Sequence, residues 1–356
     1  MVAARYINRE LLLVFAVTSL VLLVVAVGGR FIGYLQEAAA GKYAAEGLVG
    51  ILRLRMPGFL QLLLPFAFYI AVLLTFSRLH ADREMAVLQC GGSSPERLLK
   101  WIAAPLAAVV GITAWLSLQV TPASNAALAA WMTEQRARTA FEAVSPGLFN
   151  VFDRDGRVVY AESVSRDRGT LTGVFISDYR PGQPVATVWA KEGRQYQDER
   201  TGSRFLVLKD GRRYLGGSGA RNYRVARFDT LSQRIAENGR PPRRIDEDAV
   251  STAALWQRGG AAAMAELHWR VGLPVFCLVG TLMAMGIARA RPRQGRFARV
   301  VPGVLMLLAY YFLLLVNLSA LAAGVVPSPV GLWPAHALFY VAGAILFVRA
   351  GRPVAA

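Results

Sequence analysis

Residues 300–348 of the chain read "VVPGVLMLLAYYFLLLVNLSALAAGVVPSPVGLWPAHALFYVAGAILFV" and contain no Asp, Glu, Lys or Arg. An apolar run of about 20 residues is long enough to cross the hydrocarbon core of a bilayer as a helix. Near the middle, the segment "GVVPSPVGLWP" has three prolines and two glycines, which end a helix and turn the chain. The stretch therefore predicts two membrane spans joined by a short turn.

The rest of the chain extends this pattern. Of its 356 residues, 54% are hydrophobic and only 18% are charged, below the roughly 25% of ordinary soluble domains. The six predicted spans are Leu11–Gly33, Gly58–Ser77, Trp101–Val120, Val271–Ala288, Val300–Ala323 and Leu332–Val348. The first run also has features of a secretory signal peptide, namely basic residues before it and "EAAAG" after it, but its length favours a retained span.

The orientation of the spans is indicated by the basic residues, which give the chain a net charge of +17 and lie mostly beside the apolar runs. Basic residues cluster before span one, after span two, after span four and after span six, which are alternate loops and therefore lie on one side of the membrane. These clusters are Arg5 and Arg9; Arg78, Arg83, Arg97 and Lys100; Arg289, Arg291, Arg293, Arg296 and Arg299; and Arg349 and Arg352. Cytoplasmic loops carry the excess of Lys and Arg, so both termini are expected in the cytoplasm.

The segment between spans three and four has a different residue pattern, without long apolar runs. "GRVVYAESV", "LTGVFISDY", "VATVWAKE", "SRFLVLKDG" and "NYRVARFD" alternate apolar and polar residues and are separated by Gly-, Pro- and Asp-rich turns. Short strands at regular spacing predict a β-sandwich or jelly roll on the outer side of the membrane. Its flanks, Thr121–Phe141 and Ala249–Arg270, are expected to be helical connectors.

Spans two and three are joined by "EMAVLQCGGSSPERLLK" (84–100), here called the elbow. Met85, Val87 and Leu88 are expected on one side of a short helix, which Gly91 and Gly92 end because glycine adopts the left-handed conformation without steric cost. Ser93 or Ser94 then caps the next helix, whose first turn suits Pro95. Two interpretations are open: a stiff hairpin that only joins two spans, or a coupling helix that docks on another protein.

Enzyme and metal motifs are absent from the sequence. It has no G-x-x-x-x-G-K-[ST], no G-x-S-x-G and no H-E-x-x-H. The three His and two Cys are scattered, so no cofactor or metal site is expected. There is also no nucleic-acid-binding motif to accompany the positive charge. The sequence therefore predicts a membrane protein that is not itself an enzyme.

Four motifs resemble a known family: "RYINRE" at the N-terminus, "LHADREMAVLQCGG" around the elbow, "AELHWR" before span four and "RPRQGR" after it. Together with the layout of three spans, a β domain and three spans, they resemble the LptF branch of the LptF/LptG family, over nearly the whole chain. Members of this family are permease subunits of an ABC transporter that exports lipopolysaccharide.

The resemblance implies a set of partners. An LptF-type chain pairs with LptG in the inner membrane of a Gram-negative cell, and a cytoplasmic dimer of the ATPase LptB powers the pair. The lipid is extracted from that membrane and passes through LptC and LptA, a periplasmic β-jellyroll bridge. In the family the elbow is a coupling helix, here about residues 79–91. The implied contacts with the ATPase are Arg83, Glu84, Met85, Leu88 and Gly91, with Glu84 at the acidic position.

Because the implied substrate carries phosphates, its contacts are expected among the basic residues near the outer side of the membrane. Arg30 lies within the first apolar run, where a charge usually faces a cavity or the bundle interior. Lys42, Arg53 and Arg55 follow it, and arginine suits bidentate contact with phosphate. These four residues are the predicted contacts for lipopolysaccharide phosphates. The alternative is that Arg30 extends to the lipid headgroups, and that Arg53 and Arg55 belong to an interfacial amphipathic helix.

The sequence thus predicts an α+β membrane protein with six transmembrane helices, three plus three, flanking a periplasmic β-jellyroll-like domain. Residues 1–121 hold the first three spans and the coupling helix, residues 122–265 the β domain with its connectors, and residues 266–356 the last three spans. A different class of function is also open: a membrane-anchored periplasmic β domain that acts as an interaction module without transport.

Overall fold

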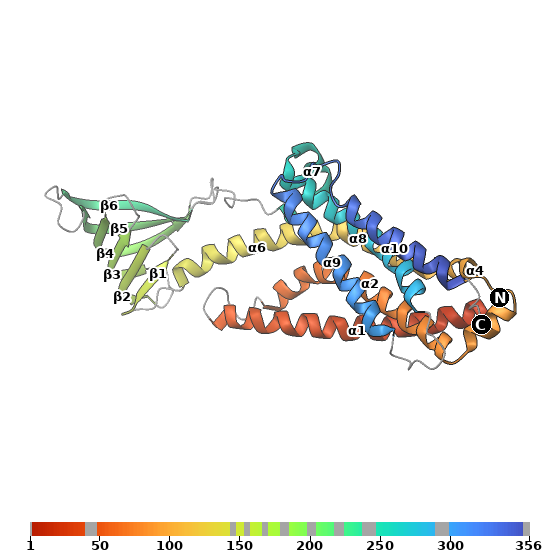
Figure 1. Ribbon diagram of the computed structural model, residues 1–356. Helices are drawn as coiled ribbons and strands as arrows, with labels where there is room; N and C mark the ends of the chain where they lie inside the picture. Colours follow the sequence, from red (N-terminus) through yellow and green to blue (C-terminus); the bar gives the residue numbers. More distant parts are fainter. Residues whose placement is uncertain are drawn as a thin grey trace. The chain divides into compact units, whose positions relative to one another are not determined.

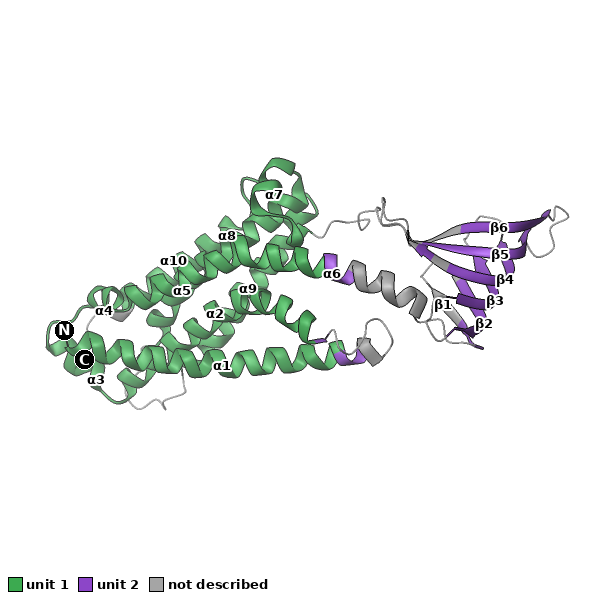
Figure 2. Ribbon diagram, turned by 180° about the vertical axis from the view of Figure 1, so that it is seen from behind, with its two compact units in different colours: residues 1–34, 49–129, 245–356 green, residues 35–48, 130–244 purple. Residues whose placement is uncertain are grey.

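The computed structural model describes residues 2–39, 48–142, 147–152, 157–165, 170–178, 185–197, 204–216, 224–236, 247–288 and 299–351 (Figure 1). Contacts divide the chain into two compact units (Figure 2). Unit 1 comprises residues 1–34, 49–129 and 245–356, and unit 2 comprises residues 35–48 and 130–244. Unit 1 contains the apolar helices and unit 2 contains the sheet.

The helices follow one another in two groups, before and after the strands. The first group is α1 (Val2–Ala39), α2 (Leu48–Ala81), α3 (Glu84–Cys90), α4 (Pro95–Trp101), α5 (Ala103–Trp115), the π-helix η2 (Leu116–Val120) and α6 (Thr121–Glu142). The second group is the short 3₁₀-helix η3 (Glu247–Ala249), α7 (Thr252–Arg258), α8 (Ala261–Ile287), α9 (Val300–Ala322) and α10 (Trp333–Gly351).

All six predicted spans fall on helices of unit 1, apart from Ile102, Ala288, Ala323 and Leu332, which lie just outside them. Among the described residues, five helical segments are long and apolar enough to cross a membrane: α1, α2, α5 with η2 and α6, α8, and α9. The sixth, α10, is shorter; its 19 residues rise about 28 Å, close to the thickness of the hydrocarbon core. The turn predicted between spans five and six is present, with Gly324 and Gly331 at positive φ.

The helices differ in how much of their surface the chain itself covers. In the most apolar stretch of α8, 67% of the residues are buried, whereas the figure for α1 is 6%. Helix α8 is therefore the centre of unit 1. It packs its Phe276 against Phe66 of α2 and Tyr310 of α9. Tyr310 in turn shares a buried hydrogen bond of 2.5 Å with Nδ1 of His336 in α10.

The β domain is a six-stranded antiparallel sheet in which each strand pairs with its neighbours in sequence. The strands are β1 (Phe149–Phe152), β2 (Arg157–Val164), β3 (Thr170–Asp178), β4 (Ala186–Gln197), β5 (Arg204–Leu215) and β6 (Arg224–Ala236). One face buries a cluster of apolar side chains that includes Leu171, Val174 and Leu208. The predicted α+β class, with membrane helices and an antiparallel sheet, is confirmed.

The sheet carries a crease that crosses five strands. Strictly alternating strands return to the same face at even spacings. In β2–β6, however, two buried or partly buried positions lie three residues apart. The first row across the strands is Ala161, Val174, Ala190, Gly211 and Phe228, and the second is Val164, Leu171, Gly193, Leu208 and Leu231. Both rows belong to the same side of the sheet.

The crease is made by residues that the strand register skips. Gly173 and Asp210 have positive φ values of 58° and 49°, the left-handed conformation typical of bulges that bend a strand. Lys191 lies on the strand between them and binds Asp210 at 2.5 Å. This ion pair lowers the pKa of the Asp210 carboxyl. The described strands thus form one up-and-down sheet bent along this line, not the two-sheet sandwich or jelly roll predicted from the sequence.

Candidate functional site

Local hydrogen bonds close the turns before and after the short helix of the elbow. Arg83 precedes α3 with a left-handed φ of 61°. After α3, Gly92 has a φ of 77°, and the Ser93 N–H donates to the carbonyl of Leu88 at 3.0 Å. Ser94, rather than Ser93, caps α4, since its Oγ accepts from the Arg97 N–H at 3.2 Å. The predicted stop and restart of the helix are therefore present.

The two sides of α3 are chemically different. Met85 is buried, and the half-buried Leu88 packs against the same apolar cluster. Val87 is 72% exposed, so the prediction that it shares a side with Met85 and Leu88 is wrong. Residues two positions apart do not face each other on a helix. Arg83 and Gly91, at the two ends of α3, are exposed.

Glu84, at the first position of α3, is held by side chains from two other helices. The Tyr6 hydroxyl of α1 lies 3.1 and 3.4 Å from its two carboxylate oxygens. Arg78 of α2 donates from Nη2 to the Tyr6 hydroxyl at 2.9 Å and also lies 3.9 Å from Glu84. Glu10, one turn after Tyr6, pairs with Arg78 at 3.3 Å. We call Tyr6, Glu10, Arg78 and Glu84 the Tyr6 cluster.

The basic residues predicted to bind phosphate lie on α1 and α2. Arg30 is exposed on α1, and Arg53 is exposed near the start of α2. Arg55 is half-buried, and within the described part of the chain its buried Nε has no hydrogen-bond partner. Lys42 lies outside the described residues. No hydrogen bond or ion pair joins the three described arginines to one another.

A second arginine-centred cluster lies where the β-domain connectors meet the spans. Arg270 of α8 is almost fully buried, with a side-chain exposure of 2%. Its Nε donates to Glu266 at 2.8 Å, and its Nη1 donates to Thr252 at 2.9 Å. Its Nη2 faces three carbonyl oxygens, those of Val250 at 2.9 Å, Glu247 at 3.2 Å and Asp248 at 3.4 Å. We call this arrangement the Arg270 joint.

The π-helix η2 completes the Arg270 joint from the other connector. The Ser117 hydroxyl donates to the Arg270 carbonyl at 3.0 Å, and the Thr252 hydroxyl donates to the Leu118 carbonyl at 2.6 Å. π-helical turns interrupt the regular hydrogen bonding of a helix and often occur at functional sites. The joint therefore binds the segment that leaves the spans to the segment that returns to them.

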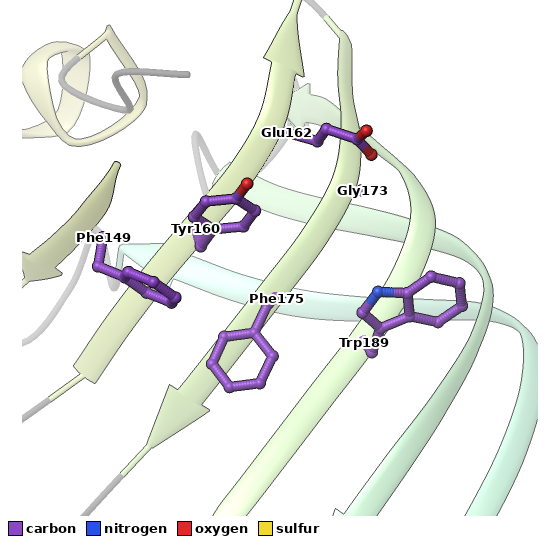
Figure 3. A pocket seen from close by; sticks show the side chains of 6 residues that line it. All are labelled: Phe149, Tyr160, Glu162, Gly173, Phe175 and Trp189. Carbon is purple, nitrogen blue, oxygen red and sulfur yellow. The ribbon is translucent and has the colours of Figure 1, made fainter. Parts of the chain in front are cut away.

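The face of the sheet opposite the buried apolar cluster carries a shallow hollow of about 340 Å³ (Figure 3). The side chains of Phe149, Tyr160, Phe175 and Trp189 stand opposite one another on four successive strands. The carboxylate of Glu162 lies beside Gly173, which has no side chain to fill the space. Phe149 and Trp189 are exposed. The hollow adds an aromatic surface to the domain.

Sequence reasoning missed Tyr6, Glu10 and Arg270 as contact residues. Tyr6 and Arg270 occur in the motifs "RYINRE" and "AELHWR", but neither motif indicates which distant groups they meet. One contact could have been predicted from the sequence: Glu266 and Arg270 are four residues apart, the spacing of an ion pair on one helix face. The carbonyl partners come from a different segment and leave no pattern in the sequence.

Known proteins are similar to this chain over almost its full length. Residues 5–349 match the family model described as "Lipopolysaccharide export system permease LptF/LptG". The chain is 26% identical over 348 residues to the lipopolysaccharide export system permease protein LptF of Escherichia coli K12, covering 97% of this chain and 94% of that protein. The LptF protein of Shigella flexneri matches with the same identity and coverage.

Proposed function

This chain belongs to the LptF/LptG family of lipopolysaccharide export permeases, and from that premise we propose that it is the LptF-type half of an ABC transporter. It is a multi-pass inner-membrane protein and pairs with an LptG-type permease. A separate cytoplasmic LptB-type ATPase dimer hydrolyses the ATP, since the chain has no phosphate-binding loop of its own. Both termini lie in the cytoplasm and the β domain in the periplasm.

The observation that carries the proposal is the elbow. Seven residues of helix, closed by hydrogen bonds at both ends, join two membrane helices and keep Val87 exposed. Glu84 supplies a carboxylate one turn before Val87. A helix with one apolar and one acidic group on its accessible side suits a groove on a partner, and charge-assisted hydrogen bonds are the stronger kind. Arg83, Glu84 and Gly91 would contact the ATPase, while Met85 and Leu88 anchor α3 to the spans.

The lipid site is proposed on the basic residues of α1 and α2. Arg30, Lys42, Arg53 and Arg55 would bind the phosphates of lipopolysaccharide, because guanidinium groups match phosphate oxygens in a bidentate way. Arg55 supports this assignment through its buried Nε, which in the described part of the chain is left without an acceptor. A phosphate oxygen would supply that acceptor.

The acyl chains need an apolar path, and among the largely uncovered segments, which include α5 with α6, we propose α1 and α9 for it. Only 6% of the most apolar stretch of α1 and 22% of that of α9 is buried within the chain. We assign these exposed sides to the lipid and to the LptG-type partner. Spans one and five, which correspond to α1 and α9, would form the lateral gate on this subunit.

The β domain would hand the lipid to the periplasmic bridge. Within the described strands, β1 and β6 each pair on one side only and so form the edges of the sheet. Exposed edges allow a partner strand to extend the sheet. A neighbouring β-jellyroll of the LptC type, followed by LptA, would continue it in this way.

The proposal is tested by purifying the tagged chain from its native host in mild detergent, beside a Glu84→Ala variant. Mass spectrometry then reports the proteins and lipids that are retained. We expect an ATPase, a second permease and lipopolysaccharide with the native chain, and loss of the ATPase with Glu84→Ala. If the native chain retains no ATPase but does retain a periplasmic protein, the chain is instead an anchored interaction module.

A further inference from the structure

Among the described residues, helix α1 contacts the elbow through its first turns. Ile7 and Leu11 are buried in the apolar cluster that also contains Met85 and Leu98 of the elbow. The Asn8 side chain donates to the Trp101 carbonyl at 2.9 Å. The start of α1 is thus packed against both ends of the elbow.

Farther along α1, the side chains lie mostly outside the chain's own core. After the edge-to-face contact between Phe15 and Phe68, the exposed residues include Val17, Leu20, Val21, Val24, Val25 and Ile32. A helix that is packed at its start and has little contact with its own chain farther along can follow the movement of its start. Any displacement of the elbow therefore has a direct route into α1.

Only one arrangement of hydrogen bonds allows the Tyr6 hydroxyl to bond to both Arg78 and Glu84. Arg78 carries donors and no acceptor, and an ionised Glu84 carries acceptors and no donor. The Tyr6 oxygen therefore accepts from Arg78 at 2.9 Å and donates its proton to Glu84 at 3.1 Å. This sequence of bonds connects α2, α1 and α3. A phenylalanine would break both bonds and keep the ring.

We propose that Tyr6 is a positioning residue for Glu84 and the contact through which movement of the elbow reaches α1. This inference rests on the proposed docking of Glu84 on an ATPase. Tyr6 aims the carboxylate at its partner, and Arg78 with Glu10 sets the position of the Tyr6 hydroxyl. When the ATPase dimer displaces α3, the Tyr6 cluster transmits the displacement to α1, the helix assigned to the lipid gate.

The test compares Tyr6→Phe, Glu84→Gln and the double variant in proteoliposomes that contain the complete complex, purified with its partners. Three quantities are measured: the ATPase retained, the ATP hydrolysis rate, and the lipopolysaccharide released per ATP. The matched control is Tyr340→Phe, which also removes one hydroxyl, from an exposed tyrosine of α10.

We expect Tyr6→Phe to retain the ATPase and the native melting temperature, but to release about threefold to tenfold less lipid per ATP, the range of one net hydrogen bond. In the Glu84→Gln background the Tyr6→Phe change should add nothing. Tyr340→Phe should match the native complex.

The failure of this inference is distinguishable from the failure of the proposed function. If Glu84→Gln lowers the lipid released per ATP and Tyr6→Phe does not, the positioning role is overturned while the docking role stands. Additive losses in the double variant would also overturn it, because the two residues would then act independently. If Glu84→Gln itself changes neither the ATPase retained nor the lipid released, the docking of the elbow is wrong, and the role of Tyr6 with it.

Discussion

Arg78 and Arg270 each bind three segments of the chain together, but their surroundings differ. Arg270 is 2% exposed, and backbone carbonyls make up most of its acceptors. Arg78 is 27% exposed, and its ion pairs are with the side chains of Glu10, Asp82 and Glu84, at 3.3–3.9 Å. One arginine is enclosed by backbone and the other is surrounded by side chains that can move.

The difference separates a fixed connection from one that can change partners. A buried guanidinium must keep all its acceptors, because an uncompensated buried charge is very costly. A half-exposed guanidinium loses little when one carboxylate leaves, since water and the remaining carboxylates replace it. The Arg270 joint therefore serves as a permanent connection at the base of the β-domain connectors. The Tyr6 cluster is suited to sharing the Glu84 carboxylate with another protein while Tyr6 keeps its hydrogen bond.

Breaking the fixed connection should have the largest effect. Arg270→Leu leaves the Glu266 carboxylate and three carbonyls without their donor, and we expect a loss of about 3–5 kcal/mol in the free energy of unfolding. Thermal unfolding of the purified chain in detergent measures this. The control is Arg258→Ala, which removes a partly exposed arginine paired with Glu247 at 3.5 Å and should cost under about 1 kcal/mol. Equal melting temperatures for the two variants would contradict the assignment of a joint.

Removing the exchangeable carboxylate should weaken assembly and leave folding intact. Glu84→Ala deletes a charge-assisted contact worth about 1.5–3 kcal/mol, so the ATPase should bind about tenfold to a hundredfold more weakly. Titration of the labelled ATPase onto the detergent-solubilised permease pair measures this change. The control is Glu96→Ala, an exposed acidic residue in the first turn of α4. A similar loss in both variants would point to general charge attraction rather than to a site at Glu84.

A smaller effect is expected at the edge of the Arg270 joint. Ser117→Ala removes the hydrogen bond from η2 to the Arg270 carbonyl and should cost about 1 kcal/mol. Combined with Arg270→Leu, it should cost less than it does alone, because the guanidinium contacts hold residue 270 and its backbone carbonyl in place for Ser117. Melting temperatures of the two single variants and the double variant give this coupling. Full additivity would show that η2 and Arg270 are independent.

The smallest of the four expected effects is that of salt, which should distinguish the partly exposed Arg78 from the buried Arg270. Raising the ionic strength from about 0.1 to 0.5 M screens exposed charges, whereas buried pairs are screened much less. We expect the affinity of the ATPase for the elbow to fall by about threefold or less, and the melting temperature of the isolated chain to stay the same. A melting temperature that falls with salt would indicate that the Arg270 joint is open to solvent.

The parts of this structure that could be predicted are those in which a local rule decides. The apolar helices follow from the length of the apolar runs, and the elbow follows from its glycines, Ser94 and Pro95, since caps and turns depend on neighbours in sequence. The placement of Val87 was wrong because seven residues are too few for hydrophobic periodicity to be reliable. The class of the fold and the permease family were both within reach of the sequence.

The parts that could not be predicted depend on residues far apart in the chain. Tyr6 and Glu84 are separated by 78 positions, and Ser117 and Arg270 by 153. Arg270 fell just outside the predicted fourth span, which began at Val271, so its burial was not recognised. The crease could not be predicted either, because two apolar residues spaced three apart on a single strand look like a local irregularity. Only the pairing of five strands shows that the irregularities align.

The crease limits where the β domain can change in length. Deleting Gly173 would place Leu171 and Val174 two positions apart and restore regular alternation, which would straighten β3 between two bent neighbours. The same holds for Asp210 in β5. Insertions in the turns between strands leave both rows of apolar side chains in place. Relatives of this protein, and engineered versions that carry tags or fused domains, should therefore differ in length at the turns and keep the same number of residues across the crease.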